Sequence, residues 1–350
     1  MKTYSVSVLG SILALALCAV NANAQANSPA AQAHVDAAKA AMNPSNNPSP
    51  KPWQVYDYLF KMHCTPPKPN AAPAEGGNES QSVARPHDSW YTPPAKVFDN
   101  LYYLGTNIDD IWAIKTSAGI ILIDTNFDWD VKELVVDGLK KFGMSASDIK
   151  YIVITHAHSD HYWGATTLKQ IVPNAPILMS EADWNVIAKD HSPANLKPKK
   201  EMVITDGQKL TLGDTTITLY ITPGHTPGTV SMIIPLKDGN ERHVGGVWGG
   251  MTLSVNRNGV EYFPDWPTLL RTYLASLKRF KEIEDKAGVD TLISIHARHD
   301  KTIEKIAALQ ARKPGEPNPF VSKDNLNRYV TLISECVQAQ QIWRASTGAN

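Results

Sequence analysis

The residues best suited to chemistry in this chain are the histidines and the acid of one short segment. Residues 155–161 read Thr-His-Ala-His-Ser-Asp-His, so that His156, His158, Asp160 and His161 lie within six positions. Imidazole nitrogens and carboxylate oxygens are ligands that suit zinc. The first two histidines are two positions apart, so both can approach one ion while the acid and the third histidine turn toward another. This density of ligands predicts a metal site, and a loop whose histidines only cap the following helix is the weaker interpretation.

Two single histidines complete the set if they fold back onto the same edge of a sheet. His225 lies in the tight turn Thr-Pro-Gly-His-Thr-Pro-Gly, directly after an expected strand. His296 follows the apolar stretch at 292–295, which is also an expected strand. In open sheets, ligands bind in the crevice outside the carboxyl ends of the strands. We therefore expect both residues to join the metal site, and the other six of the 11 histidines to have no role in it.

Composition and charge narrow the class of protein. The chain has 350 residues, of which 43% are hydrophobic and 19% charged, enough for one large domain or two small ones. Lys and Arg together number 34, as do Asp and Glu, which gives a formal net charge of +0. A neutral chain has no overall field to attract nucleic acid or an anionic membrane. We therefore expect a small-molecule substrate held by a local site, while the sequence leaves the oligomeric state open.

The first 24 residues have the features of a secretory signal peptide. Lys2 supplies a positive start, residues 6–20 are mostly apolar, and Ala22-Asn23-Ala24 has the small-x-small pattern of a cleavage site. The apolar stretch is shorter than the ~20 residues that span a bilayer, which disfavours an uncleaved anchor. We expect residues 1–24 to be removed and the mature protein to be periplasmic or secreted, without stable membrane insertion.

Export to an oxidising compartment changes the interpretation of the two cysteines beyond the signal peptide. Cys64 and Cys336 become a candidate disulfide that would tie the N-terminal region to the last expected helix. Two unpaired buried thiols are the alternative. Neither cysteine lies near the histidine motifs, so we assign them no catalytic role.

Residues 25–94 differ in composition from the rest of the chain. They are rich in Ala, Asn and Pro, which is typical of an extended, partly flexible segment. Within them, apolar residues at helical spacing predict a short helix at 53–62 that could dock on the main domain. The expected organisation is a signal peptide at 1–24, this N-terminal extension at 25–94, and one main domain at 95–350.

Beyond residue 94, short apolar strands alternate with amphipathic helices. The first half is expected to contain strands at 100–104, 111–115, 119–124 and 151–155 and helices at 131–142 and 163–172. The second half is expected to contain strands at 203–205, 209–212, 216–221, 230–234, 244–248 and 292–295 and helices at 267–283, 301–312 and 325–343. Two sheet-plus-helix halves that face each other are the simplest packing of this order, which makes the fold class α/β.

These motifs together resemble those of the metallo-beta-lactamase superfamily. The resemblance rests on the His-x-His-x-Asp-His motif at 156–161, the Gly-His-Thr-Pro-Gly turn at 224–228 and a later histidine at a strand end. Residues 100–106 and 119–124 match that family's opening sheet, so the likeness covers roughly 94–300 and more. It implies a four-layer αββα sandwich and a zinc hydrolase domain at 95–350, although the family acts on many substrates.

The segment after the strand expected at 244–248 narrows the resemblance to one subclass. Thiol esterases, lactonases and nucleases of this superfamily generally bridge their two metals with an Asp there, and the first two lactamase subclasses place a Cys there. Residues 249–254 read Gly-Gly-Met-Thr-Leu-Ser and contain neither. The pattern resembles subclass B3, in which a Ser-Leu-Ser segment offers hydroxyls to the substrate carboxylate. Thr252 and Ser254 are the corresponding substrate-binding candidates, although Met251 replaces the usual Asp.

The resemblance implies two zinc ions per chain with three protein ligands each. The first ion would be held by His156, His158 and His225, and the second by Asp160, His161 and His296. A hydroxide shared by the two ions would attack the carbonyl of a β-lactam ring. Asp160 would orient that hydroxide and is the catalytic residue that the resemblance implies.

Other functions stay open at this point. The chain reads Ala-Arg-His at 297–299 in place of the family's usual Pro-Gly pair, which changes the wall that faces the substrate. Arg298 could hold an anionic substrate group or could be a solvated loop charge. A lactonase or phosphodiesterase with weak or no lactamase activity is the main alternative, and the missing bridging Asp argues against it. An exported binding protein with structural zinc is a third, disfavoured because structural sites are normally closed by four ligands.

Overall fold

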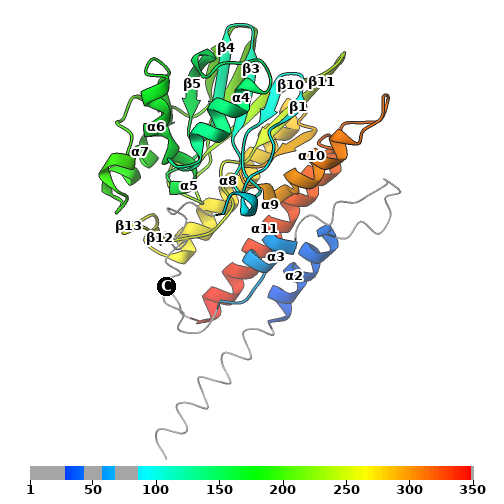
Figure 1. The fold of residues 1–350 in the computed structure, drawn as a ribbon. Coiled ribbons are helices and arrows are strands. Elements are labelled where there is room, and N and C mark those ends of the chain that lie inside the picture. The colour runs from blue at the N-terminus through cyan, green and yellow to red at the C-terminus, as the bar shows by residue number, and fades with distance from the viewer. Residues whose placement is uncertain (1–27, 43–56, 68–85, 348–350) are drawn as a thin grey trace, which may run out of the picture.

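The computed structural model describes residues 28–42, 57–67 and 86–347. Two sheets face each other and helices cover their outer faces, as Figure 1 shows. The fold is therefore the four-layer αββα sandwich that the sequence analysis predicted. The expected signal peptide and part of the N-terminal extension lie outside the described residues.

The first sheet has seven strands in the order β1-β2-β3-β4-β5-β6-β7. They are β1 (Ala95–Phe98), β2 (Leu101–Tyr103), β3 (Trp112–Thr116), β4 (Gly119–Ile123), β5 (Ile149–Val153), β6 (Ile177–Ser180) and β7 (Met202–Ile204). Strands β1 to β4 form an antiparallel meander. Strands β4 to β7 run parallel, because each connection between them returns the chain to the end of the sheet at which the previous strand began.

The second sheet has five strands in the order β14-β11-β10-β9-β8. They are β8 (Gln208–Leu212), β9 (Thr215–Ile221), β10 (Val230–Asp238), β11 (Glu241–Val247) and β14 (Thr291–Ile293). Strand β14 pairs in parallel with β11, and the other pairs are antiparallel. Two further strands, β12 (Asn256–Arg257) and β13 (Val260–Glu261), form a separate small hairpin.

The helices occupy the connections between strands and both ends of the chain. They are α2 (Pro29–Met42), α3 (Asp57–His63), α4 (Gly138–Lys140), α5 (Ser159–Tyr162), α6 (Gly164–Ile171), α7 (Glu181–Lys189), α8 (Trp266–Ala287), α9 (Ala297–Asp300), α10 (Thr302–Gln310) and α11 (Lys323–Thr347). A π-helical segment, η3 (Lys132–Asp137), precedes α4, and single 3₁₀ turns lie at His87–Ser89, Ala146–Asp148 and Ala194–Leu196.

Three hydrophobic cores account for the four layers. The core between the sheets includes Trp112 of the first sheet and Met232 of the second. A second core joins the outer face of the first sheet to its helices and includes Leu122 and Leu168. The third joins α2, α3, α8 and α11 to the outer side of the second sheet. Strand β4 is buried on both faces, which explains why its sequence is a continuous apolar run.

The structure differs from the expected elements in several places. The helix expected at 131–142 is divided into the π-helical segment η3 and the single turn α4. The sequence analysis missed β1, β6 and α7. Strand β6 is four residues long and buried throughout, and periodicity alone does not identify such a short buried strand.

Two described parts of the N-terminal extension form helices. Helix α2, which the sequence analysis did not anticipate, packs along α11, and its Ala31, Val35 and Ala38 are buried. Helix α3 overlaps the helix expected at 53–62 and also contacts α11. The expectation of an extended segment was wrong for α2, because its small side chains allow close helix packing.

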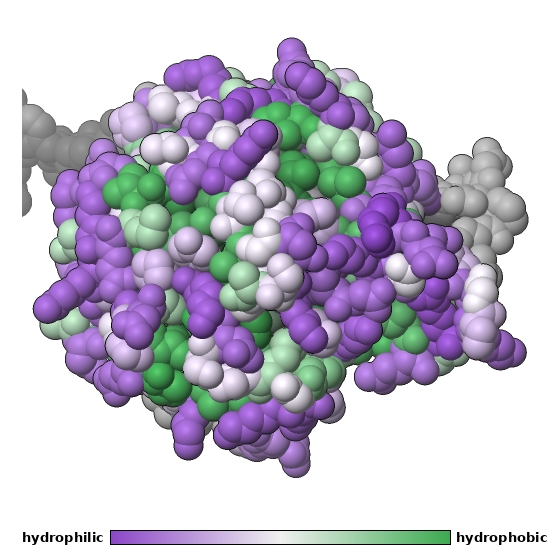
Figure 2. All heavy atoms as spheres, turned by 90° about the horizontal axis from the view of Figure 1, so that it is seen from above, coloured by the Kyte–Doolittle hydropathy of each residue, from purple (hydrophilic) through white to green (hydrophobic). Residues whose placement is uncertain are grey.

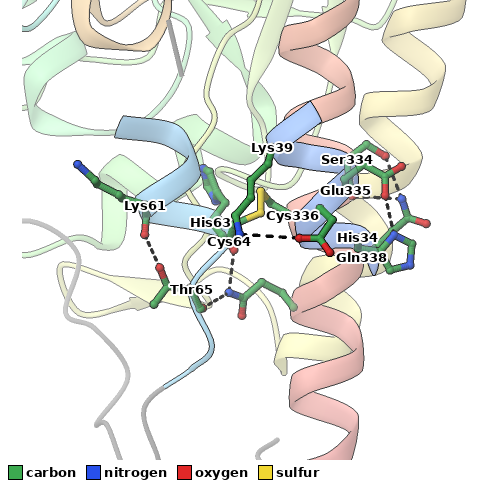
Figure 3. The surroundings of a disulfide bond; sticks show 12 residues. His34, Lys39, Lys61, His63, Cys64, Thr65, Ser334, Glu335, Cys336 and Gln338 are labelled. Atoms are coloured by element: carbon green, nitrogen blue, oxygen red, sulfur yellow. Dashed lines mark hydrogen bonds and ion pairs between the residues drawn. A yellow bond between two sulfur atoms is a disulfide. The ribbon is translucent and has the colours of Figure 1, made fainter. Parts of the chain in front are cut away.

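A disulfide bond joins Cys64 to Cys336, with their Cα atoms 4.6 Å apart. Figure 3 shows that it links the C-terminal end of α3 to the middle of α11, with α2 alongside. The Gln340 amide on α11 also donates hydrogen bonds of 2.9 and 2.7 Å to the carbonyls of His63 and Thr65. Of the two alternatives for the cysteines, the structure therefore shows the disulfide.

The described surface exposes few large hydrophobic side chains, and these are Tyr58, Ile171 and Met202. On the face shown in Figure 2, hydrophobic side chains form small separate groups among hydrophilic ones. Within the described ranges, no helix combines the length and the hydrophobicity that crossing a membrane requires.

Candidate metal centre

The six predicted metal ligands come from loops that follow three strands. The loop after β5, together with α5, carries the motif at 156–161. The turn between β9 and β10 carries His225, and His296 directly precedes α9 after β14. The structure brings the six residues together as the two groups of three that the sequence analysis named.

The first group contains three buried histidines, His156, His158 and His225. The Nε2 atom of His156 lies 3.0 Å from Nδ1 of His158 and 2.9 Å from Nε2 of His225. Three ring nitrogens thus converge on one point. Neutral imidazoles that present lone pairs to a common centre match the donor set of a zinc ion.

The second group lies beside the first and is less buried. The Nε2 atom of His161 is 3.2 Å from Nε2 of His296 and 3.6 Å from Oδ2 of Asp160. The His296 ring also approaches Asp160, with Nε2 and Oδ2 3.8 Å apart. The ring centroids of His156 and His161 are 4.0 Å apart, so the two groups adjoin. The donor atoms fit a pair of metal ions, one in each group.

In three of the ligand rings, an oxygen atom holds the second nitrogen. His161 Nδ1 lies 2.8 Å from Oδ2 of Asp124, and His296 Nδ1 lies 2.9 Å from Oδ1 of Asp109. His225 Nδ1 lies 2.8 Å from the carbonyl oxygen of Thr252. Such partners select the tautomer and the orientation of a metal-binding ring. These contacts leave Nε2 of all three rings directed toward the centre.

Asp124 connects the end of β4 to the motif loop. Its carboxylate accepts hydrogen bonds from the Thr155 amide and hydroxyl at 2.7 and 2.8 Å, in addition to its contact with His161. The residue is fully buried and adopts a positive φ of 60°. A left-handed backbone conformation costs free energy for a residue other than glycine. It persists only where contacts with the surrounding residues stabilise it. Here the hydrogen bonds of the Asp124 carboxylate stabilise this conformation.

Asp183, near the start of α7, joins the two loops that carry the first group. Its Oδ2 accepts hydrogen bonds from the Ala157 amide at 2.9 Å and the Thr226 hydroxyl at 2.7 Å. Its Oδ1 accepts one from the Gly228 amide at 2.8 Å. Burial raises the pKa of Asp183 to about 6, although these three donors oppose the rise. One carboxylate thus fixes the loop of His156 and His158 against the loop of His225.

Two glycines let the segment after β11 approach His225. A Cβ atom on Gly250 would lie 2.1 Å from the His225 ring, and one on Gly249 would lie 1.9 Å from the Val230 carbonyl oxygen. Real Cβ atoms do not approach other atoms so closely, so each position requires glycine. The Gly249-Gly250 pair therefore shapes the first ligand group.

The histidines of the first group are held neutral. Burial lowers the pKa of His156 and His158 well below the ordinary value, and neighbouring imidazoles lower it further. Burial also lowers the pKa of His225 to about 3. A neutral imidazole is the form that binds a metal ion.

The second group combines opposite charges. Burial disfavours the charged ring of His161, but the Asp124 and Asp160 carboxylates outweigh burial and raise its pKa. Burial likewise disfavours ionised Asp160, but His161 and Arg257 lower its pKa below the ordinary value. Asp160 therefore stays ionised, as a metal ligand requires.

The two substrate-binding candidates, Thr252 and Ser254, both make hydrogen bonds within the protein. Thr252 Oγ1 is 2.9 Å from Nδ1 of His225. The Ser254 hydroxyl donates a short hydrogen bond to the carbonyl oxygen of Asn256. The structure therefore makes Thr252 a support for His225, and the Ser254 proton is used in a hydrogen bond within the protein.

His299 lies in α9 beside the centre, although the sequence analysis expected it in a loop without a role. It is buried, and its ring centroid is 4.8 Å from that of His296. Tyr58 of α3 stacks on the His299 ring, and the two ring centroids are 5.8 Å apart. Tyr58 and Arg298 also line a cavity of about 420 Å³. The N-terminal extension thus reaches a residue that packs against a predicted ligand.

Similarity to known proteins agrees with this geometry. The sequence pattern of the metallo-beta-lactamase superfamily matches residues 105–239. The crystal structure of BJP-1, a subclass B3 metallo-beta-lactamase of Bradyrhizobium japonicum, is 30% identical, with a TM-score of 0.61 over 73% of this chain and 96% of that one. This chain belongs to the metallo-beta-lactamase superfamily. A second superfamily member, FEZ-1 from Legionella gormanii, is 27% identical, with a TM-score of 0.58 over 68% of this chain and 91% of that one.

Curated relatives within the superfamily have other activities. The N-acyl homoserine lactonase AttM of Rhizobium radiobacter is 32% identical over 115 residues, which are 29% of this chain and 42% of the lactonase. The chain spans about half the length of the curated relatives it matches. Superfamily membership and the ligand groups together identify a metal-dependent hydrolase.

The sequence analysis missed four residues that shape the centre: Asp109, Asp124, Asp183 and Arg257. Asp124 had a signal, because it directly follows a buried apolar strand and so lies at a sheet edge. The other three are common surface residue types in segments far along the chain from the ligands. No local pattern distinguishes them from solvated charges.

Proposed function

We propose that this chain is a dinuclear zinc hydrolase that opens the amide bond of β-lactam rings. Its likeness to BJP-1, over 96% of that protein, supports a lactamase. Its likeness to FEZ-1 supports the same activity.

The observation that carries the proposal is that the two ligand groups share no residue. Residues 249–254 lie against His225, where Thr252 binds the ring and Gly250 packs on it. This segment contains neither a carboxylate nor a thiol. In superfamily members that act on thioesters, lactones or nucleic acids, an Asp in that place generally bridges the metals. Three separate ligands for each ion therefore favour the B3 lactamase pattern.

The two ligand groups would each hold one metal ion. His156, His158 and His225 would hold one zinc ion, and Asp160, His161 and His296 the other. Zinc in such a site supplies Lewis acidity and a hydroxide nucleophile at neutral pH.

Asp160 is suited to orient that nucleophile. Its Oδ1 atom is buried and has no hydrogen-bond partner among the described residues. It can therefore accept a hydrogen bond from a water molecule at the centre. Asp109 and Asp124 keep the rings of His296 and His161 in position through the reaction.

A lactonase is the second candidate. The similarity to the N-acyl homoserine lactonase of Rhizobium radiobacter favours it. Lactone and lactam opening both require attack on a ring carbonyl, so the same centre could serve either reaction. The missing bridging Asp is the reason why we rank the lactam first.

We also propose that the protein acts in the periplasm or outside the cell. Residues 1–24 support this with the pattern of a signal peptide. The disulfide between Cys64 and Cys336 supports it as well, because such bonds persist in oxidising compartments.

Hydrolysis of a chromogenic cephalosporin tests the proposed function. The protein, expressed as the full chain, is assayed with zinc, after chelator treatment and after zinc is restored. We expect zinc-dependent turnover that His158→Ala abolishes and that His87→Ala, at an exposed histidine outside the centre, leaves unchanged. A protein that binds two zinc ions and hydrolyses an N-acyl homoserine lactone but no lactam would establish the second candidate instead.

A further inference from the structure

We propose that Arg257 is the residue that binds the carboxylate of the substrate beside the metal centre. This inference rests on the proposed function. Arg257 lies on β12, and its side chain is 20% exposed. The NH1 atom of its guanidinium lies 3.1 Å from Nδ1 of His158. The NH2 atom lies 3.9 Å from Oδ1 of Asp160. One positively charged group thus reaches a ligand from each of the two groups.

The hairpin that carries Arg257 holds it in place. Arg257 pairs with Val260, and the turn between them is Asn258-Gly259, with positive φ values of 49° and 78°. Asn-Gly with both residues left-handed is the favoured two-residue hairpin turn. The Asn258 side-chain amide donates a 3.1 Å hydrogen bond to the Ser192 hydroxyl. The main-chain carbonyl of Asn258 accepts another, also 3.1 Å long, from the His191 amide. A short turn tied to a second loop fixes the backbone from which Arg257 extends.

The Nδ1 atom of His158 has one lone pair, which can serve a single partner. The atom accepts a hydrogen bond from Arg257 or binds a metal ion, but it does not do both. Metal binding by His158 therefore releases donors of the guanidinium that still point toward the centre. Metal ions repel a neighbouring cation, and the single charge of the Asp160 carboxylate offsets only part of that repulsion. The position of Arg257 thus favours an anionic ligand at the open side of the centre.

The guanidinium has the right chemistry for a carboxylate. It is always charged, and its planar fork of donors matches the two oxygens of a carboxylate. The hydroxyl of Ser254, which the sequence analysis assigned to this task, donates to Asn256 instead. Arg298, the other candidate for an anionic group, is exposed on α9 and lines the separate cavity beside Tyr58. Among the residues that the structure describes, Arg257 is the Arg or Lys side chain that contacts the predicted metal ligands.

Matched substrates test the proposal through turnover. Benzylpenicillin carries the carboxylate, and its methyl ester does not. We expect Arg257→Ala to raise KM for benzylpenicillin by ~10–100-fold, the cost of losing a hydrogen bond between charged groups, and to leave the KM for the ester nearly unchanged. Arg257→Lys should recover part of the loss, because Lys keeps the charge but not the fork. Arg298→Ala is the matched control and should change neither KM.

A binding measurement tests the same residue without turnover. Calorimetric titration of the zinc-loaded protein with hydrolysed benzylpenicillin should show a ~10–100-fold weaker affinity for Arg257→Ala than for the unmodified chain. Zinc content should stay at the unmodified value in the variant, because Arg257 is not a ligand. If no lactam is turned over but this affinity difference is found, the proposed function fails and the anion site stands.

Several results would overturn the anion site. Equal losses for the acid and the ester would make Arg257 a structural residue instead. If Arg298→Ala raised the KM for benzylpenicillin and Arg257→Ala did not, the anion site would lie at α9. Unchanged affinity for the hydrolysed penicillin in Arg257→Ala would remove the role altogether.

Discussion

At the scale of single residues, the centre is defined as much by the groups behind the ligands as by the ligands. His161 and His296 each rest on a buried carboxylate, from Asp124 and Asp109. Asp183 instead acts on the backbone, since it binds the amides of Ala157 and Gly228 beside ligands of the first group. Asp124 and Asp109 thus select the orientation of two ligand rings, and Asp183 fixes the loops that carry the first group.

Substitution of Asp183 should weaken the first metal site selectively. Asp183→Ala removes three hydrogen bonds to the two loops of that site, and loss of such a partner lowers metal affinity by about 10–100-fold. Zinc affinity is measured by competition with a graded chelator in a His296→Ala background, where only the first group is complete. Asp109→Ala is the matched control, because Asp109 contacts only the second group and should leave this affinity unchanged. Equal losses for both would show that Asp183 acts on general stability.

At the scale of elements, the end of β11 and two buried hydrogen bonds to α8 place the segment that contacts His225. Trp248, directly after β11, donates a 2.8 Å hydrogen bond from Nε1 to Oε1 of Glu284 on α8. Tyr273 of the same helix donates one of 2.8 Å to the carbonyl of Met251. Helix α8 therefore holds both ends of the segment that contains Gly249 and Gly250.

Glu284 makes the stability of this contact depend on pH. Burial raises its pKa from 4.5 to about 8, so the folded protein binds a proton that the unfolded chain releases in this range. Stability must then fall as pH rises from about 4.5 to 8. Glu284→Gln stays neutral and can still accept the Trp248 hydrogen bond. We expect the variant to match the unmodified protein near pH 5 and to melt a few degrees higher near pH 8.5.

Thermal unfolding across this pH range is the measurement. Glu282→Gln, at an exposed position on the same helix, is the matched control and should follow the unmodified chain at every pH. A Glu284→Gln variant with the same loss of stability between pH 5 and 8 would show that another group carries the dependence.

At the scale of the whole molecule, the two ends of the described chain meet on one side of the sandwich. Helices α2 and α3 pack on α11, and the disulfide fastens α3 to it, as Figures 1 and 3 show. Tyr58 of α3 also stacks on His299 beside the second ligand group. Helices α2 and α3 therefore belong to the folded unit, and α3 supports the centre from outside.

Removal of the disulfide should lower stability without abolishing the fold. The bond closes a loop between residues 272 positions apart, and bonds of this kind typically contribute about 2–4 kcal/mol. Cys64→Ser with Cys336→Ser should therefore lower the melting temperature by several degrees. A reductant should shift the unmodified protein to the same value and leave the double variant unaffected. An unmodified protein whose melting temperature ignores the reductant would contradict the expectation.

The sequence by itself determined the family, the layered fold and the six candidate ligands. This was possible because four ligands share one short motif, and the other two follow strands whose apolar pattern is visible. A strand end marks a sheet edge, so local signals were sufficient to place His225 and His296. Only one pairing was possible for the two cysteines that lie beyond residue 24.

Only the tertiary structure decided which other groups meet those ligands. Asp109 and His296 are 187 positions apart, and Arg257 and His158 are 99 apart, so nothing in the local sequence indicates their contact. The helix α2 was hidden for a related reason, since its small side chains become a packing face only against α11. Local sequence sets the type of element and the ligand chemistry. Long-range packing decides which charge lies beside which ring.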